Sequence, residues 1–374
     1  MRRIFNLASL FAVAVMLFSC EKASVVDTGV KFPDFQLIVT NDVFKNDGVD
    51  GAKFTALYEG TDVTAEAKFL DANKQELNLD NGVLRTTKEG VIKVFARYGA
   101  MSTYNTEMRE QGLVSVRAVS YDVPAVAADP NPGKTSFVHR AFLTQYTGTN
   151  CGYCPQMVEA IRELYRDNTI PDKAVLTAIH DYNSNDPAYI IAAPASPGGH
   201  PYMQIDLTTG FSNTENNAAM TRSLVDQSVA DKAKVGVSVN SVYYADKKTV
   251  VAKVQIKAVE DGYYNIGAWL LEDNIFGQQA GAKDDSYNTH NNCVRVADSY
   301  YYDTYFGHFV GQLKAGETAE KTFIMVDTKN VWKAENLHIA AFASYGYKKN
   351  GKTYYTVANA VDAAINGETR YEYK

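Results

Sequence analysis

Short runs of alternating apolar and polar residues fill most of the chain between residues 34 and 121. Turn sequences such as Asn46-Asp47-Gly48 and Asn81-Gly82 separate these runs. Alternation with a period of two turns one side of a strand toward a core, and several short strands at this spacing are typical of a β-sandwich. We therefore predict a sandwich over residues 34–121, with strands at 35–39, 53–58, 63–70, 91–98 and 113–119.

The pattern changes after a proline-rich segment at residues 122–135. We predict that this segment is a linker, because proline is excluded from helix interiors and central strands. In residues 155–167 apolar side chains recur at helical spacing, at Met157, Ile161 and Leu164. Strand candidates at 137–146 and 174–179 flank this helix, and a second helix is predicted at 214–229. Alternating strands and helices indicate a partly parallel sheet, so residues 136–232 are predicted to form an α/β domain.

The last third of the chain, residues 233–374, again has the pattern of β-strands. Residues 235–244 and 249–259 alternate and predict a hairpin around Asp246-Lys247-Lys248. We predict a second sandwich-like domain with a long insertion at 274–311, and so a multidomain α+β fold. The other predicted strands are 264–272, 318–325, 338–345 and 354–360.

The N-terminus has the layout of an export signal. Two arginines precede an apolar run that is too short to span a bilayer. The run ends in Leu17-Phe18-Ser19-Cys20, which resembles a lipobox, the signal for lipidation of a cysteine in bacterial lipoproteins. Residues 1–19 are thus predicted to be a signal peptide, with Cys20 lipidated and residues 20–33 a tether to the membrane. Stable anchoring requires more than one acyl chain. The alternative is an ordinary signal peptide that is cleaved nearby and leaves Cys20 free.

Composition narrows the class of protein. Hydrophobic residues make up 46% of the chain and charged residues 21%, as in ordinary folded proteins. The net charge of −6, without a basic cluster, argues against a partner that is a nucleic acid. The sequence indicates no cofactor.

Two of the four cysteines, Cys151 and Cys154, form a Cys-Gly-Tyr-Cys motif between a predicted strand and a predicted helix. Unpaired backbone N–H groups and the helix dipole stabilise an anion at a helix N-terminus, and the thiolate is the reactive form of cysteine. We therefore expect Cys151 at the helix cap as the attacking thiol, with Cys154 buried one turn further in as the resolving thiol. Cys293 is left without a pairing partner and is expected to be a buried thiol.

Two other interpretations of the motif stay open. A structural Cys151–Cys154 disulfide is a weak one, because such a bond closes a very small loop and therefore removes little entropy from the unfolded chain. Zinc would need two more ligands, and no second paired-cysteine motif or spaced histidine pair is present, so no metal site is assigned. His180 and Asp181 end a predicted strand and are weaker candidates for the site.

The strand, the paired cysteines and the helix resemble a thioredoxin fold, and the Gly-Tyr dipeptide is similar to that of periplasmic disulfide isomerases. The resemblance implies a cis-proline beside the motif, a role that fits Pro201 in His200-Pro201. It also implies a buried carboxylate on the preceding strand, where this chain has Gln145. Residues 34–121 loosely resemble bacterial immunoglobulin-like domains.

Residues 136–374 further resemble a family of outer-membrane lipoproteins related to a 28-kilodalton outer-membrane protein. This resemblance implies a location in the cell envelope, on an outer membrane, with the protein either periplasmic or surface-exposed. The expected function is that of a thiol–disulfide oxidoreductase or isomerase acting on envelope or secreted proteins that contain cysteines. The alternative is a non-catalytic surface lipoprotein that binds proteins or glycans and keeps a vestigial thioredoxin-like domain.

Overall fold

The computed structural model describes residues 35–104, 113–298, 304–329, 331–349 and 352–374. The predicted signal peptide, Cys20 and the tether lie outside these residues. In the described part of the chain, no helix is long and apolar enough to cross a membrane.

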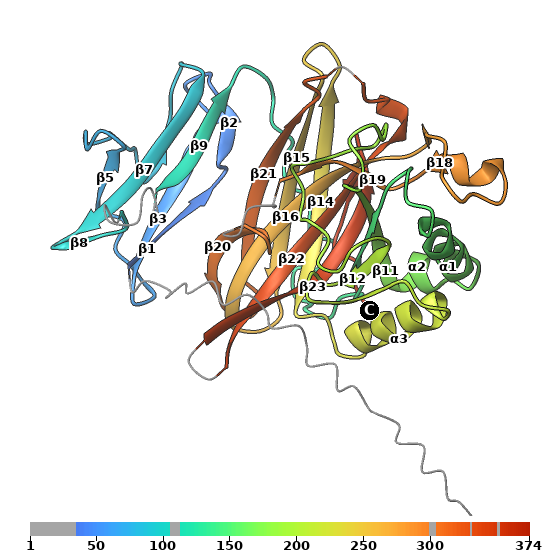
Figure 1. The fold of residues 1–374 in the computed structure, drawn as a ribbon. Helices are drawn as coiled ribbons and strands as arrows, with labels where there is room; N and C mark the ends of the chain where they lie inside the picture. The colour runs from blue at the N-terminus through green and yellow to red at the C-terminus, as the bar shows by residue number, and fades with distance from the viewer. Residues whose placement is uncertain (1–34, 105–112, 299–303, 330, 350–351) are drawn as a thin grey trace, which may run out of the picture.

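The described residues between 35 and 119 form two small sheets (Figure 1). The two sheets share one apolar core. In β3 the inward positions Ala52, Phe54 and Ala56 are fully buried, as the alternation in the sequence predicts. Phe44 of β2 and Val94 of β7 fill the same core. One sheet contains β1 (Phe35–Thr40), β3 (Ala52–Tyr58), β4 (Thr61–Asp62) and β6 (Val83–Leu84), and the other contains β2 (Val43–Lys45), β5 (Lys68–Asp71), β7 (Gly90–Tyr98), β8 (Met101–Ser102) and β9 (Val114–Val119).

A nine-stranded mixed sheet organises the rest of the molecule. Along it the strands follow the order β13-β12-β10-β11-β19-β16-β22-β23, and β20 pairs with β16. Its strands are β10 (Ala141–Thr147), β11 (Ala174–His180), β12 (Tyr202–Ile205), β13 (Thr209–Ser212), β16 (Gly262–Glu272), β19 (Cys293–Ala297), β20 (His308–Leu313), β22 (Leu337–Lys349) and β23 (Lys352–Ala364).

A four-stranded sheet in the order β21-β15-β14-β24 packs on one face of β16 and β22. Val237, Val254, Ile266 and Ile339 are fully or almost fully buried between the two sheets. The strands of this second sheet are β14 (Val235–Tyr244), β15 (Thr249–Ala258), β21 (Thr318–Val326) and β24 (Glu368–Thr369), and a separate two-stranded pair consists of β17 (Ile275–Phe276) and β18 (Thr289–His290).

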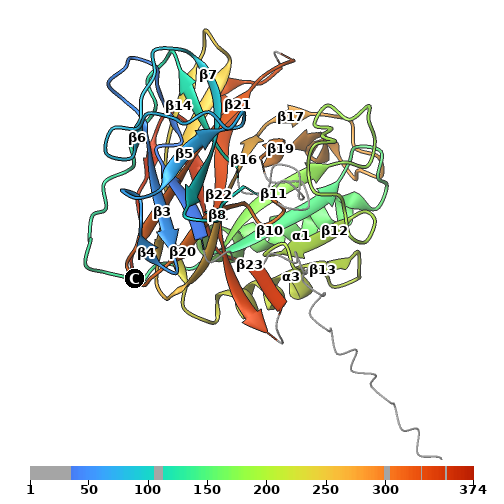
Figure 2. The same ribbon diagram turned by 90° about the vertical axis from the view of Figure 1, so that its left-hand side faces the viewer.

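Three α-helices are present in the described residues, α1 (Cys154–Arg166), α2 (Thr169–Lys173) and α3 (Asn217–Val229). They lie on the side of the molecule away from the N-terminal sheets (Figures 1 and 2). The predicted apolar face of α1 packs on β10 and β12, where Met157 and Leu164 share a buried cluster with Leu143 and Met203. The amphipathic spacing read from the sequence therefore covers one face of the β10–β12 end of the sheet.

The predicted fold class is wrong, because residues 136–232, all of which the structure describes, do not form a separate central α/β domain of the thioredoxin type. β19 lies between β11 and β16, so that the strands of residues 136–232 share one sheet with β16, β19, β20, β22 and β23 of residues 233–374. The two regions also share a core, in which Phe142 of β10 contacts Trp269 of β16 and Phe342 of β22, with ring centroids 5.0 and 4.7 Å apart. Residues 274–311 were predicted to be an insertion. They contain the apolar strand β19, which joins β11 to β16.

The N-terminal sheets are joined to the four-stranded sheet by buried polar contacts. Asp42 accepts hydrogen bonds from the Thr322 N–H and the Lys321 ammonium group, both at 3.0 Å. Lys253 donates to Asn41 Oδ1 at 2.8 Å. The proline-rich residues 122–135 contain no helix or strand, and Asp122 within them pairs with Lys45 of β2 at 2.7 Å.

Candidate functional site

Cys151 and Cys154 form a disulfide, with their Cα atoms 5.4 Å apart. Cys154 is the first residue of α1 and Tyr153 is its N-cap, so the expectation that Cys151 caps the helix is wrong. Cys151 lies in the preceding turn, where its N–H donates to Gly148 O at 3.1 Å. Cys151 is only 3% exposed and Cys154 is fully buried, whereas Tyr153 is 68% exposed. The motif therefore presents its middle residues, and not its sulfur atoms, to solvent.

A buried carboxylate holds the turn in front of the disulfide. Asp186 accepts hydrogen bonds from Thr149 N–H at 2.6 Å and Ala188 N–H at 2.8 Å, and it lies 2.9 Å from His180 Nδ1. Burial alone would raise the pKa of Asp186, but the hydrogen bond and charge of His180 and these N–H donors lower it to about 2. The carboxylate therefore stays ionised and fixes the start of the Cys-Gly-Tyr-Cys turn.

Pro201 lies beside this turn, and the His200–Pro201 peptide bond is cis, as predicted. The next residue, Tyr202, pairs with Tyr146 near the end of β10, directly before the turn begins. The ring of Tyr182 links the two segments: its centroid is 5.2 Å from that of His200. A Cβ atom on Gly148 would come within 2.6 Å of the Tyr182 Cβ. The structure thus brings Cys151, Cys154 and Pro201 to one end of β10.

Gln145 replaces the carboxylate that the resemblance to thioredoxins implied. It faces the same side of the sheet as its partner Met203, which packs under α1. The side chain is 5% exposed, and its Nε2 has no hydrogen-bond partner among the described residues. A buried donor without a partner is costly. A proton acceptor is missing at this position, as the sequence indicated.

A loop within the predicted insertion at residues 274–311 lies against the disulfide turn. We call residues 275–290 the strap; its ends are joined by the pairing of β17 with β18. Gln279 Nε2 donates to Cys151 O at 2.9 Å and approaches Gly148 O and Thr149 O at 3.3 and 3.2 Å. Ala280 N–H donates to Thr149 O at 2.7 Å. These contacts hold the strap against the turn that carries the buried Cys151.

The outer half of the strap rests on α1. Tyr287 O–H donates to Glu159 at 3.0 Å, and the Arg162 guanidinium lies 4.1 Å from the centre of the Tyr287 ring. Arg162 also donates to Ser286 O and Oγ, both at 3.0 Å. Sequence reasoning missed the strap, because its contacts are made by an amide, an N–H group and backbone carbonyls, which leave no periodic signal.

Cys293 extends the buried network behind the turn. Its Sγ lies 3.6 Å from His180 Nε2, while the other nitrogen of His180 is bound to Asp186. Burial raises the pKa of the Cys293 thiol well above its ordinary value. This order of cysteine, histidine and aspartate is that of a nucleophilic triad, but Cys293 is fully buried and His180 is 1% exposed. Cys293 is a buried thiol, as predicted.

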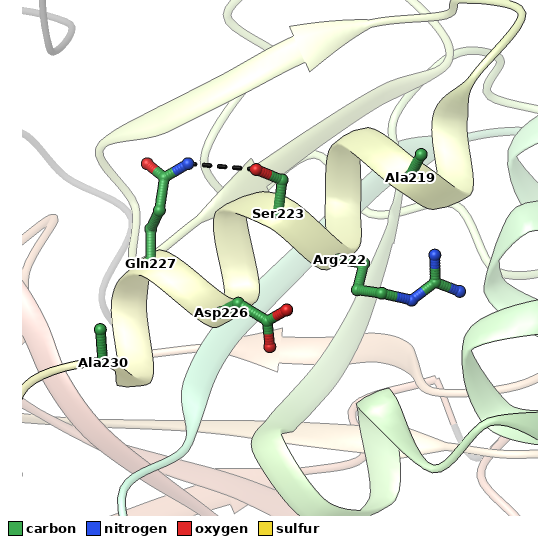
Figure 3. A pocket seen from close by; sticks show the side chains of 6 residues that line it. All are labelled: Ala219, Arg222, Ser223, Asp226, Gln227 and Ala230. Carbon is green, nitrogen blue, oxygen red and sulfur yellow. Dashed lines mark hydrogen bonds between the residues drawn. The ribbon is translucent and has the colours of Figure 1, made fainter.

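Two surface depressions lie away from the disulfide turn. One is a shallow region of about 490 Å³ on α3, lined by six residues from Ala219 to Ala230 (Figure 3). Its Arg222 already pairs with Asp167 and Glu163, and its Asp226 pairs with Lys173. A second, between α1 and the start of α3, has a volume of about 560 Å³. Neither is lined by a residue of the disulfide turn. Within the described ranges no three His, Cys, Asp or Glu side chains gather as metal ligands.

Comparison with known proteins identifies no family. No protein-family model and no curated protein matches the sequence. Among solved structures, HBP35 of Porphyromonas gingivalis has a TM-score of 0.49 at 16% identity, over 64% of this chain and 79% of that one. An Agrobacterium tumefaciens protein has a TM-score of 0.37 at 12% identity, over 65% of this chain and 100% of that one. Both TM-scores lie below 0.5, so neither similarity informs the activity of this chain.

Proposed function

We propose that this chain is an exported, lipid-anchored protein of the cell envelope that exchanges disulfides with other envelope proteins through Cys151 and Cys154. The observation that carries the proposal is a disulfide across two intervening residues at the first turn of α1. A bond that closes so small a ring contributes only about 2 kcal/mol by chain entropy. Stability alone is therefore a weak reason to keep it, and an oxidising compartment is where such a bond persists.

The proposed reaction transfers two electrons from a partner dithiol to this disulfide. A partner thiolate attacks Cys151 Sγ, the Cys151–Cys154 bond breaks, and Cys154 leaves as a thiolate. A second partner thiolate then attacks the partner's sulfur in the mixed disulfide and releases Cys151. The partner is oxidised to a disulfide, and Cys151 and Cys154 end as thiols that have taken up the two protons.

The position of Cys154 favours it as the leaving group. It is the first residue of α1, and the positive end of the helix dipole stabilises a thiolate there. Few N–H groups are free to help, because Pro155 has none and the Gln156 N–H is bound to Tyr153 O at 3.2 Å. The dipole is therefore the main source of stabilisation on α1 itself.

Redox titration of the full chain against glutathione tests this function. We expect a reversible equilibrium between the disulfide and the two thiols, and oxidation of a reduced, cysteine-containing polypeptide by the wild type. Replacement of Cys151 by serine should abolish that oxidation, and unchanged activity of Cys151→Ser would refute the proposal. Replacement of Cys293 by alanine serves as the control, because this buried thiol lies outside the proposed reaction.

A second function is favoured by the burial of Cys151 beneath the strap. A non-catalytic envelope lipoprotein that binds proteins or glycans would not need an accessible sulfur atom. This alternative predicts that a variant with both Cys151 and Cys154 changed to serine retains every partner of the wild type. Pull-downs from envelope extracts with the two forms distinguish the functions, because loss of cysteine-containing partners from the double variant would contradict non-catalytic binding.

A further inference from the structure

The strap lies against the backbone of the turn that carries Cys151. In thiol–disulfide exchange the nucleophile must reach the sulfur atom. Here residues Gln279, Ala280 and Gly281 lie directly on the turn that carries Cys151, which is 3% exposed. The contact at Gly281 is so close that a Cβ atom there would be 2.3 Å from Gly152 O. We propose that the strap is an autoinhibitory cover, which must lift before Cys151 can react.

This inference rests on the proposed exchange function and adds a way in which that function is regulated. The strap is a compact loop whose ends meet at the short β17–β18 pair, in which Ile275 pairs with His290 and Phe276 with Thr289. Asn274, directly before the strap, and Asn292, two residues after it, have left-handed backbone, φ 59° and 55°. The segment between them therefore has a small base and well-defined ends, as a loop that opens as a unit requires.

The contacts of the strap are also of a kind that opens locally. They are hydrogen bonds and a cation–π contact to the disulfide turn and to α1, together with an edge-to-face ring contact of His290 with His180 of β11. No side chain of the strap belongs to the two apolar clusters that hold β10 and β11. Phe276, at the base of the strap, is 71% exposed. Regions with few buried apolar contacts open with less free energy than the whole fold. A partner that binds the strap or replaces it would thereby expose Cys151.

The test is the rate at which dithiothreitol reduces the Cys151–Cys154 bond in the folded full chain. Gly281→Ala introduces a Cβ against Gly152 O, and Gln279→Ala removes the amide that binds the turn. Gly316→Ala is the matched control, because Gly316 also has positive φ (86°) but a Cβ there meets no atom within 4 Å. Alkylation and mass spectrometry of the peptides report the reduced cysteines, and alkylation of Cys293 reports global unfolding.

We expect both strap variants to be reduced at least about tenfold faster than the wild type, since Gln279→Ala loses a buried hydrogen bond and Gly281→Ala places a Cβ against Gly152 O. Gly316→Ala should match the wild type, and Cys293 should stay unmodified in every sample. Equal rates in all four proteins would overturn the proposal, as would faster reduction accompanied by alkylation of Cys293. If the strap variants are reduced rapidly but do not oxidise a reduced polypeptide, the result supports the strap as a cover and contradicts the proposed exchange function.

Discussion

Asp186 offers a stringent test of the structure around the disulfide turn. In Asp186→Asn the side chain loses its charge. Its amide NH₂ must then face the N–H group of Thr149 or Ala188, both of which donate to the carboxylate in the wild type. A buried group left without its partner costs about 1–3 kcal/mol. We expect the substitution to lower the free energy of unfolding by about 2–4 kcal/mol at pH 7.

The pH dependence gives a second measure of the same contacts. The pKa of Asp186 is about 2 in the folded protein, against 3.8 ordinarily. Linkage then gives a contribution of about 2 kcal/mol from ionisation. Because the folded pKa is the lower one, this stability is fully present above about pH 4 and is lost as the pH falls toward 2. The difference between wild type and variant should shrink over that interval.

Urea unfolding with the disulfide intact, followed by tryptophan fluorescence, measures these values, because Trp269 is buried in the folded protein. Asp167→Asn is the matched control. Hydrogen bonds from Thr169 and Arg222 lower the pKa of Asp167 to about 2 as well, but this carboxyl lies at the surface. Its loss should matter much less, because solvent screens exposed pairs. Equal destabilisation by the two substitutions, or a loss in Asp186→Asn that is unchanged between pH 7 and pH 2.5, would refute the reasoning.

Three further outcomes follow from buried groups. Burial raises the pKa of Asp206 to about 6, so this carboxyl should cost the wild type about 3 kcal/mol as the pH rises from 4 to 8, and urea titrations of Asp206→Asn should lack that loss. Cys293 should resist iodoacetamide until urea unfolds the chain, as mass spectrometry would show. Asp42→Ala leaves Thr322 N–H and the Lys321 ammonium without their acceptor, and should lower the urea midpoint by the equivalent of about 2–4 kcal/mol.

Local structure was predictable where a single element buries one face. Met157, Ile161 and Leu164 specify the inner face of α1, and the alternation of residues 235–244 coincides with β14. In both places the side chains that form the pattern are the ones that make the core. The periodicity of the sequence therefore carries the same information as the packing.

The pairing of distant strands was not predictable in this way. β19 has five residues and follows the polar Asn291 and Asn292, so its short apolar run resembles a loop. What makes it a strand is its position between β11 and β16, where Cys293 pairs with Ala178. That register depends on contacts across more than a hundred residues, and no local pattern encodes it. The single sheet was consequently divided into two domains.

The residues of the candidate site also differ in how far the sequence predicted them. Cys151, Cys154 and Pro201 were found because each has an unusual covalent or conformational chemistry that a motif reveals. Asp186 and Gln279 were missed, since they act through backbone groups of the turn at residues 148–151. A carboxylate or an amide in a loop is common, and only the fold shows which N–H or carbonyl group it meets.

The rate at which the Cys151–Cys154 disulfide is reduced in the folded protein distinguishes the two proposed functions, because the strap lies over the turn that carries Cys151. Its hydrogen bonds from Gln279, Ala280, Arg162 and Tyr287 each contribute about 1 kcal/mol, and together they give an opening free energy of about 4 kcal/mol. Local opening would then expose Cys151 in about one molecule in a thousand. Global unfolding of a typical domain requires 5–15 kcal/mol, which exposes far fewer. A disulfide reduced about a thousandfold more slowly than in the unfolded chain is thus one that a partner reaches by lifting the strap, whereas a purely structural bond would be reduced only at the rate of global unfolding.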